Sequence, residues 1–307
     1  MHTGFTASTR VELGTSGLRV APLGWGMWRF AGAERAVARA RVDAALEAGC
    51  TLFDTADIYG LGSPAGFGGA EALFGDLLRE DPSLRARMVI ATKAGITPPT
   101  PYNSSTAYLV GACEASLKRL NIERIDLFQI HRPDLLAHPA EVAAALEKLR
   151  SDGKIAAAGV SNYTAAQAEA LCAHLPFPLA SLQPEFSPLA IEPLSDGILD
   201  LALRRRLAVL AWSPLGQGRL GGEAGGGESD PRARRVCAVL DRVAARAGVD
   251  RTAVAYAWIL AHPTRAIPLI GSQNPARIRA ATDAYRVELT RAEWYEILVA
   301  SRGQSMP

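Results

Sequence analysis

Eight short apolar segments, separated by longer stretches of helical periodicity, constrain the fold of this chain more than any other feature. Near-continuous apolar runs of this kind are typical of strands that are buried on both faces. Between them, positions such as Leu109, Cys113 and Leu120 recur at the spacing of one helical stripe. We predict strands over residues 21–25, 50–54, 88–93, 125–131, 155–160, 179–184, 208–212 and 265–271.

Strands that alternate with helical crossovers predict an α/β fold. Eight of them in a chain of 307 residues favour a closed (β/α)8 TIM barrel, with one domain over residues 1–307. An open doubly wound sheet is the alternative, but no segment resembles a second domain or a linker. Residues 11–20 predict a short N-terminal hairpin that closes the barrel bottom. A C-terminal helix over residues 290–300 would begin with a capping box of Thr290 and Glu293.

The charge balance argues against several classes of partner. Lys and Arg total 33 against 31 for Asp and Glu, so there is no electrostatic reason to expect nucleic acid or a membrane surface. No apolar run approaches the roughly 20 residues that span a bilayer, and residues 1–10 lack the apolar region of a secretory signal. The four cysteines are scattered, which predicts reduced thiols, no metal site and a cytoplasmic protein. We expect a monomer or a weak homo-oligomer.

Three successive predicted strands end in polar residues that a hydride-transfer site would need. Asp54 ends the first of them, and Tyr59 follows five residues later. Lys93 and His131 end the next two. If the strands are parallel, all four side chains meet at one end of the sheet. The sequence therefore predicts a site that combines an acid, a phenol, an amine and an imidazole.

These four groups suit the reduction of a carbonyl. A free tyrosine has a pKa of about 10, and a neighbouring ammonium such as that of Lys93 would lower the pKa of Tyr59. Asp54 can pair with Lys93 and offset its burial. A neutral His131 can donate a hydrogen bond to the substrate oxygen. None of these groups supplies a hydride, so a nicotinamide cofactor must do so.

The segment Asp-Thr-Ala-Asp-Ile-Tyr at residues 54–59, Lys93 after Ala-Thr, and His131 after Ile resemble the catalytic tetrad of the aldo-keto reductases, in particular the bacterial general type. The resemblance runs from about residue 11 to about residue 285. It implies a TIM barrel and the NADPH-dependent reduction of a small aldehyde or ketone. By this resemblance Tyr59 is the proton donor, Lys93 and Asp54 tune it, and His131 orients the substrate.

The same resemblance extends to the cofactor. Ser161, Asn162 and Gln183 match residues that hold the nicotinamide carboxamide, and Trp212 matches an aromatic residue that stacks on the nicotinamide ring. The remaining matches are Ser213, Leu215 and Gly216 along the pyrophosphate, Ser272 and Arg277 at the 2′-phosphate, and Gly26, Met27 and Trp28 as a cofactor- and substrate-lining segment. A guanidinium suits a phosphate, which favours NADPH over NADH. We expect Trp28 to line the substrate pocket, together with Tyr102 and Asn103 of a loop over residues 98–105.

Residues 216–221 fit the pattern GxGxxG and follow a predicted strand. The dinucleotide fingerprint also requires that these glycines open a helix. Here more glycines follow, and a helix becomes plausible only after Asp230 and Pro231. We therefore interpret residues 216–230 as a mobile loop.

Two other classes of function remain open. One is a regulatory barrel that binds NADPH without useful turnover. The other is a barrel lyase that uses Lys93 as an amine nucleophile. Ser161, Asn162 and Gln183 have no role in lyase chemistry.

Overall fold

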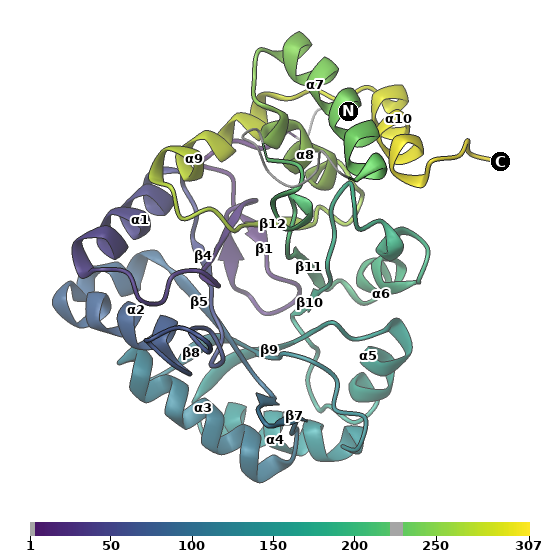
Figure 1. Cartoon of the computed structure of the whole chain (residues 1–307). Helices are drawn as coiled ribbons and strands as arrows, with labels where there is room; N and C mark the ends of the chain where they lie inside the picture. Colours follow the sequence, from purple (N-terminus) through teal and green to yellow (C-terminus); the bar gives the residue numbers. More distant parts are fainter. Residues whose placement is uncertain (1–3, 222–229) are drawn as a thin grey trace.

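The computed structural model describes residues 4–221 and 230–307, and its centre is a closed barrel of eight parallel strands (Figure 1). The closed order β10-β11-β12-β3-β4-β5-β8-β9 confirms the predicted fold class and excludes the open sheet. All eight predicted strands are present, several of them shorter than expected. They are β3 (Gly24–Gly26), β4 (Leu52–Asp54), β5 (Val89–Ala94), β8 (Ile125–Ile130), β9 (Ile155–Ser161), β10 (Ser181–Gln183), β11 (Ala208–Ala211) and β12 (Ile267–Ile270).

Helices surround the barrel. They are α1 (Arg35–Glu47), α2 (Gly69–Glu80), α3 (Thr106–Leu120), α4 (Pro139–Ser151), α5 (Ala165–Cys172), α6 (Ile198–Arg205), α8 (Arg251–Leu260) and α9 (Pro275–Ala280). Two further helices, α7 (Pro231–Ala247) and α10 (Arg291–Arg302), pack against each other, and α7 also packs on α8 (Figure 1). Among residues 4–221 and 230–307, no helix is both long and apolar enough to cross a membrane.

Side chains alternate between two cores along each strand, as the period of two requires. In β4, Leu52 packs inside the barrel, whereas Phe53 packs outward among the helices. In β8, Leu127 points inward and Phe128 outward. The next inward-facing residue of each strand stands two positions further along, closer to the carboxyl end. This alternation decides which polar side chains meet there.

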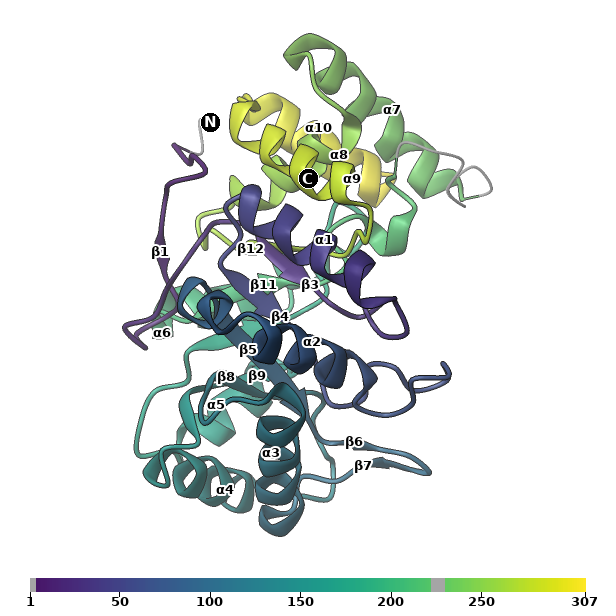
Figure 2. The same ribbon diagram turned by 90° about the vertical axis from the view of Figure 1, so that its left-hand side faces the viewer.

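The two ends of the barrel differ. The predicted hairpin is present as β1 (Val11–Glu12) and β2 (Arg19–Val20), and Leu13 and Val20 are buried against the barrel interior. Gly14 in its turn has φ +61°, and a Cβ there would lie 2.3 Å from the carbonyl oxygen of Ala180, so only glycine fits. A second hairpin, β6 (Ile96–Thr97) and β7 (Thr100–Tyr102), projects at the opposite end (Figure 2). It was not predicted as strands, because only a loop was expected over 98–105.

The C-terminal third contains the predicted capping box and the glycine motif. The capping box at the start of α10 is confirmed: Thr290 Oγ1 accepts from the Glu293 amide at 3.1 Å, and Glu293 accepts from the Thr290 amide at 2.8 Å. The glycine motif begins with only one short 3₁₀ turn, Gly216–Gly218, and α7 begins later, with Asp230 as its cap. Residues 222–229 of the predicted mobile loop lie outside the described residues.

Candidate active site

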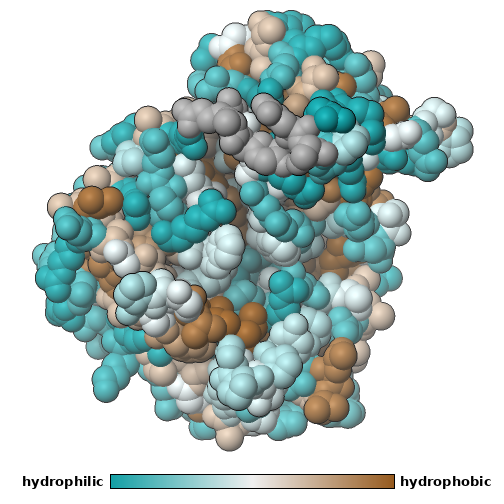
Figure 3. Space-filling model, viewed as in Figure 1, coloured by the Kyte–Doolittle hydropathy of each residue, from teal (hydrophilic) through white to brown (hydrophobic). Residues whose placement is uncertain are grey.

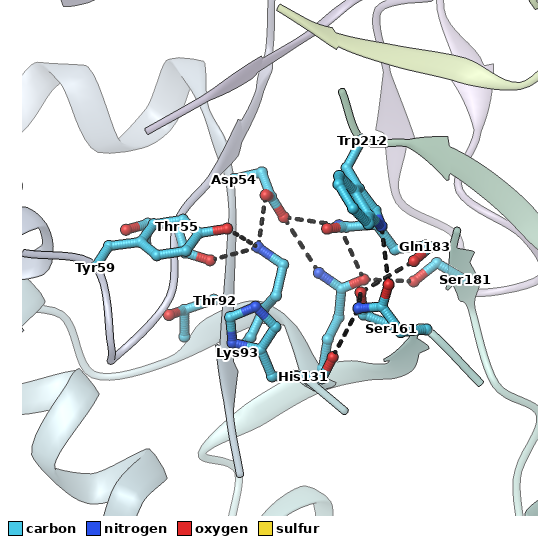
Figure 4. Close-up of polar contacts among 12 residues, drawn as sticks. Asp54, Thr55, Tyr59, Thr92, Lys93, His131, Ser161, Ser181, Gln183 and Trp212 are labelled. Carbon is cyan, nitrogen blue, oxygen red and sulfur yellow. Dashed lines mark hydrogen bonds and ion pairs between the residues drawn. The ribbon is translucent and has the colours of Figure 1, made fainter. Parts of the chain in front are cut away.

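A polar layer lies on top of the apolar barrel interior, at the carboxyl ends of the strands. Asp54 follows Leu52 on the inward face of β4, Lys93 follows Ala91 on β5, and Gln129 follows Leu127 on β8. All three polar side chains are buried. Each stands two residues beyond an inward apolar residue, so the strand period itself brings them together. Figure 4 shows the resulting cluster.

Lys93 is the centre of this cluster. Its Nζ lies 2.6 Å from Asp54 Oδ2, 2.8 Å from the Thr55 carbonyl oxygen and 3.3 Å from the Tyr59 hydroxyl (Figure 4). The side chain is fully buried, and the ammonium donates to three oxygens, which is its full capacity. The structure thus brings the amine of Lys93 to the acid and the phenol of the segment 54–59.

His131 completes the group of four predicted residues. Its ring lies edge-on to the Tyr59 ring, with centroids 5.9 Å apart and planes at 76°. Burial lowers the pKa of His131 well below its usual value, and the nearby Lys93 ammonium lowers it further. The imidazole is therefore neutral at pH 7. Its buried Nδ1 has no hydrogen-bond partner within the described chain.

The electrostatics correct one expectation. Burial lowers the pKa of Lys93, but the adjacent Asp54 carboxylate and Tyr59 outweigh it, so the net pKa is raised and the ammonium stays charged. Burial and the Asp54 carboxylate raise the pKa of Tyr59, and the Lys93 ammonium lowers it. The first two effects are larger, so the net pKa of Tyr59 is raised. The expected net lowering is therefore wrong for the protein alone, because removal of the phenol from water disfavours the phenolate.

A hydrogen-bond network supports Asp54, and it includes two residues, Gln129 and Ser181, that the sequence analysis did not predict. Gln183 Nε2 and Gln129 Nε2 donate to Asp54 Oδ1 at 3.0 and 3.2 Å. Gln129 Oε1 accepts from Gln183 Nε2 and from Ser181 Oγ, both at 3.3 Å. Gln129 and Ser181 were not predicted, because the strand-end argument considered only Asp54, Lys93 and His131 and the family resemblance did not include them. The alternation of Leu127 and Gln129 was the available signal.

The residues predicted to hold the nicotinamide also lie together. Trp212 Nε1 donates to Asn162 Oδ1 at 3.0 Å, and Asn162 Nδ2 donates to Ser161 Oγ at 2.9 Å (Figure 4). Ser161 Oγ donates to the Gln183 carbonyl oxygen at 3.0 Å. Asn162 Oδ1 keeps one lone pair and can accept from a carboxamide NH₂. These residues therefore fit a nicotinamide, held beside the Trp212 ring.

The residues predicted to contact the rest of the cofactor follow β11 and β12. Ser213 has φ 49° and accepts from the Gly216 amide at 2.8 Å, so the chain turns sharply there, and Leu215 lies within that turn. Ser272 Oγ accepts from the amide of Asn274, the residue that caps α9. Arg277 lies in the first turn of α9 and is exposed.

The predicted lining residues follow β3 and β5 at the same end of the barrel. Gly26 ends β3, the Met27 side chain is buried in the outer core, and Trp28 is exposed. A cofactor contact by Met27 would therefore involve its backbone. Tyr102 is partly exposed on β7, and Asn103 follows it. Figure 3 views the molecule from the same side as Figure 1 and shows hydrophilic and hydrophobic residues mixed around the centre of that face.

Comparison with known proteins agrees with this geometry. A model of the aldo/keto reductase family matches residues 22–300, which include all eight barrel strands. A 6-dehydroglucose reductase of Novosphingobium aromaticivorans is 50% identical over 298 residues, 96% of each chain. A 6-dehydroglucose reductase of Agrobacterium fabrum is 36% identical over 301 residues, 94% of this chain and 97% of that protein. The oxidoreductase YdhF of Escherichia coli is 37% identical over 269 residues, 85% of this chain and 86% of that protein.

The family and the names of these relatives support an oxidoreductase activity. Among the described residues, no group of three or more His, Cys, Asp and Glu side chains could hold a metal ion. The match over nearly the whole barrel and the identities above lead to one conclusion: this chain belongs to the aldo/keto reductase family.

Proposed function

We propose that this protein catalyses the NADPH-dependent reduction of an aldehyde or ketone to an alcohol, with Tyr59 as the proton donor. The observation that supports this most is the contact between Lys93 Nζ and the Tyr59 hydroxyl at 3.3 Å, in a site where Asp54 fixes the ammonium. Bound NADPH would supply the hydride to the carbonyl carbon.

The residues have separate roles in this proposal. The neutral His131 donates a hydrogen bond to the carbonyl oxygen and orients it. As negative charge develops on that oxygen, the Tyr59 hydroxyl transfers its proton to it. The Lys93 ammonium stabilises the phenolate that forms, and Asp54 keeps the ammonium in place. Ser161, Asn162 and Trp212 would hold the nicotinamide.

The charged, paired state of Lys93 argues against a Schiff-base lyase. A nucleophilic amine must be neutral, whereas Lys93 is paired with Asp54 at 2.6 Å and its pKa is raised. The ammonium also donates to the Thr55 carbonyl at 2.8 Å. All three of its protons are used, so the amine is not available to attack a carbonyl.

We propose a sugar carbonyl, such as that of 6-dehydroglucose, as the substrate. The relative named for that compound is 50% identical over 96% of the chain. The predicted lining supports the choice, because the faces of Trp28 and Tyr102 can pack on the apolar face of a sugar, and Asn103 offers hydrogen bonds to hydroxyl groups.

The test is NADPH oxidation by the purified protein with 6-dehydroglucose and with simple aldehydes and ketones. We expect turnover with carbonyl compounds and the highest kcat/KM with the sugar. Equal kcat/KM for all aldehydes would contradict the proposed substrate but not the reaction. NADPH binding without turnover of any carbonyl compound would instead indicate a regulatory barrel.

A further inference from the structure

Asp57 is an unexplained buried acid directly behind the candidate active site. It lies between Asp54 and Tyr59 in the chain, and its backbone amide donates to the Lys93 carbonyl at 3.0 Å. The side chain is 1% exposed, yet among the described residues no hydrogen bond of normal length and angle reaches either carboxylate oxygen. Buried polar groups are nearly always satisfied, so an acid without partners needs an explanation.

Other buried acids of this protein show the contrast. Asp54 accepts from Lys93, Gln129 and Gln183. Asp126, which is 5% exposed, accepts from Arg85 at 2.8 Å and from the Ile90 amide at 2.8 Å. Those carboxylates have the donors that a buried negative charge requires.

The cations around Asp57 are already committed to other acids. Arg119 of α3 lies 2.7 Å from Glu71 of α2, and Glu71 also accepts from the Thr92 hydroxyl of β5. Lys93 of β5 is paired with Asp54. Each positive charge near Asp57 is therefore matched by a negative charge before Asp57 is counted.

The net field around Asp57 disfavours its charged form. Burial and the Glu71 carboxylate raise the pKa of Asp57 to about 8, against the opposing effects of Arg119, the Ile58 amide and Lys93. Asp57 also faces two tyrosines, Tyr59 and, on α3, Tyr108. The Asp57 carboxylate raises the pKa of both phenols. A protonated Asp57 leaves this buried group of residues without an unmatched negative charge.

We propose that Asp57 is a positioning residue that carries a proton during carbonyl reduction, and that its ionisation weakens Tyr59 as a proton donor. This inference rests on the proposed function. A carboxylate near the phenol opposes the phenolate that forms as Tyr59 gives up its proton, and so counteracts Lys93. The neutral acid leaves the effect of Lys93 intact.

The kinetic test measures hydride transfer in single turnovers, with saturating NADPH and a carbonyl substrate, as a function of pH. The wild-type rate should fall several-fold above about pH 8. Asp57→Asn, which imitates the neutral acid, should lack that fall and be within about two-fold of the wild type near pH 6.5. An unchanged alkaline fall in Asp57→Asn would overturn the proposal.

Two further variants test the cause. Glu71→Gln removes the charge that raises the pKa of Asp57, so the alkaline fall should move to lower pH. Asp126→Asn removes another buried carboxylate, one with its own donors on β5 and Arg85, and should keep the wild-type pH profile. A profile in Asp126→Asn that matches Asp57→Asn would show a general effect of buried acids and would contradict the proposal.

An infrared titration of the purified protein separates this inference from the proposed function, because it needs no turnover. The wild type should show the C=O stretch of a protonated carboxyl group that disappears with a midpoint near pH 8 and is absent in Asp57→Asn. If no carbonyl compound is reduced, this band still reports on Asp57. Its absence from the wild type at pH 6.5 would overturn the inference whatever the activity.

Discussion

Single residues decide the chemistry of this barrel by which side of a strand they occupy. Asp54, Lys93 and Gln129 are inward-facing residues, each two positions beyond an apolar one, whereas Thr92 faces outward and donates to Glu71. A shift of one residue in β5 would remove the amine from the site. The candidate site is thus an extension of the strand pattern that fills the core.

The first prediction at this scale concerns the Tyr59 hydroxyl. Tyr59→Phe should lower carbonyl reduction by at least about 100-fold, because general acid catalysis contributes factors of this size. NADPH affinity should stay within about two-fold, since no predicted cofactor residue is altered. Steady-state kinetics and a fluorescence titration measure the two effects. Turnover close to the wild-type level would remove Tyr59 from the donor role.

A second residue-scale prediction concerns stability. The pKa of Asp57 is raised to about 8 in the folded protein, so the folded state binds a proton that the unfolded state loses above about pH 4. The stability of the wild type should therefore fall relative to Asp57→Asn as the pH rises from about 4 to about 8. Between pH 5 and pH 7 the difference should grow by about 3 kcal/mol, at about 1.4 kcal/mol for each of the two pH units.

Urea unfolding of both proteins at several pH values measures this difference. Asp126→Asn is the matched control, because Asp126 has donors for both of its oxygens and should be destabilised on substitution. A difference between wild type and Asp57→Asn that does not change with pH would mean that Asp57 is ionised at neutral pH.

At the scale of elements, the site lies at the carboxyl ends of the strands, and contacts with the helices hold those strand ends in position. Glu71 at the start of α2 is bonded to Thr92 on β5 and to Arg119 on α3, so it ties two helices to the strand that bears Lys93. A Cβ on Gly75 would lie 2.0 Å from the Arg119 carbonyl oxygen, so α2 and α3 pack backbone to backbone there. The position of Lys93 therefore depends on helix packing as well as on the sheet.

Arg277 on α9 is the residue that we expect to favour NADPH over NADH. Arg277→Ala should weaken NADPH by about 10- to 100-fold and NADH much less, because a hydrogen bond to a charged group contributes about 1.5 to 3 kcal/mol. Arg279→Ala is the matched control on the same helix, since Arg279 is paired with Glu47 at 2.6 Å. The dissociation constants of NADPH and NADH, measured for the wild type and both variants, test this prediction. Equal losses for NADPH and NADH would show that Arg277 does not contact the 2′-phosphate.

At the scale of the whole molecule, the predicted cofactor residues come from β3, β9, β10, β11 and β12, or from the segments that follow them. A ligand held by all of these should stabilise the closed barrel against unfolding. At a concentration of about 100 times its dissociation constant, a ligand adds about 2.7 kcal/mol.

We therefore expect NADPH to raise the melting temperature by several degrees, and by more than the same concentration of NADH. It should also quench tryptophan fluorescence, because Trp212 lies beside the proposed nicotinamide position. Trp212→Phe should lose most of the quenching and keep the thermal shift. Quenching that persists in Trp212→Phe would place the nicotinamide elsewhere.

The sequence was a good guide wherever a periodic pattern or a fixed spacing carried the information. The eight strands, the N-terminal hairpin and the capping box at Thr290 were predictable because each depends on local pattern or local hydrogen bonds. The gathering of Asp54, Tyr59 and Lys93 followed from the expectation of parallel strands. The β6–β7 hairpin was missed because it is short and its second strand is exposed.

The sequence by itself determined the fold class and the end of the barrel at which the chemistry collects, because strand period and parallel order leave few alternatives. Only the tertiary structure decided how each group titrates. The net rise in the pKa of Tyr59 and the unpartnered state of Asp57 arise from burial and from which charges face each other across β5, α2 and α3. Desolvation and pairing depend on neighbours that are distant in the chain, and a linear pattern does not contain those distances.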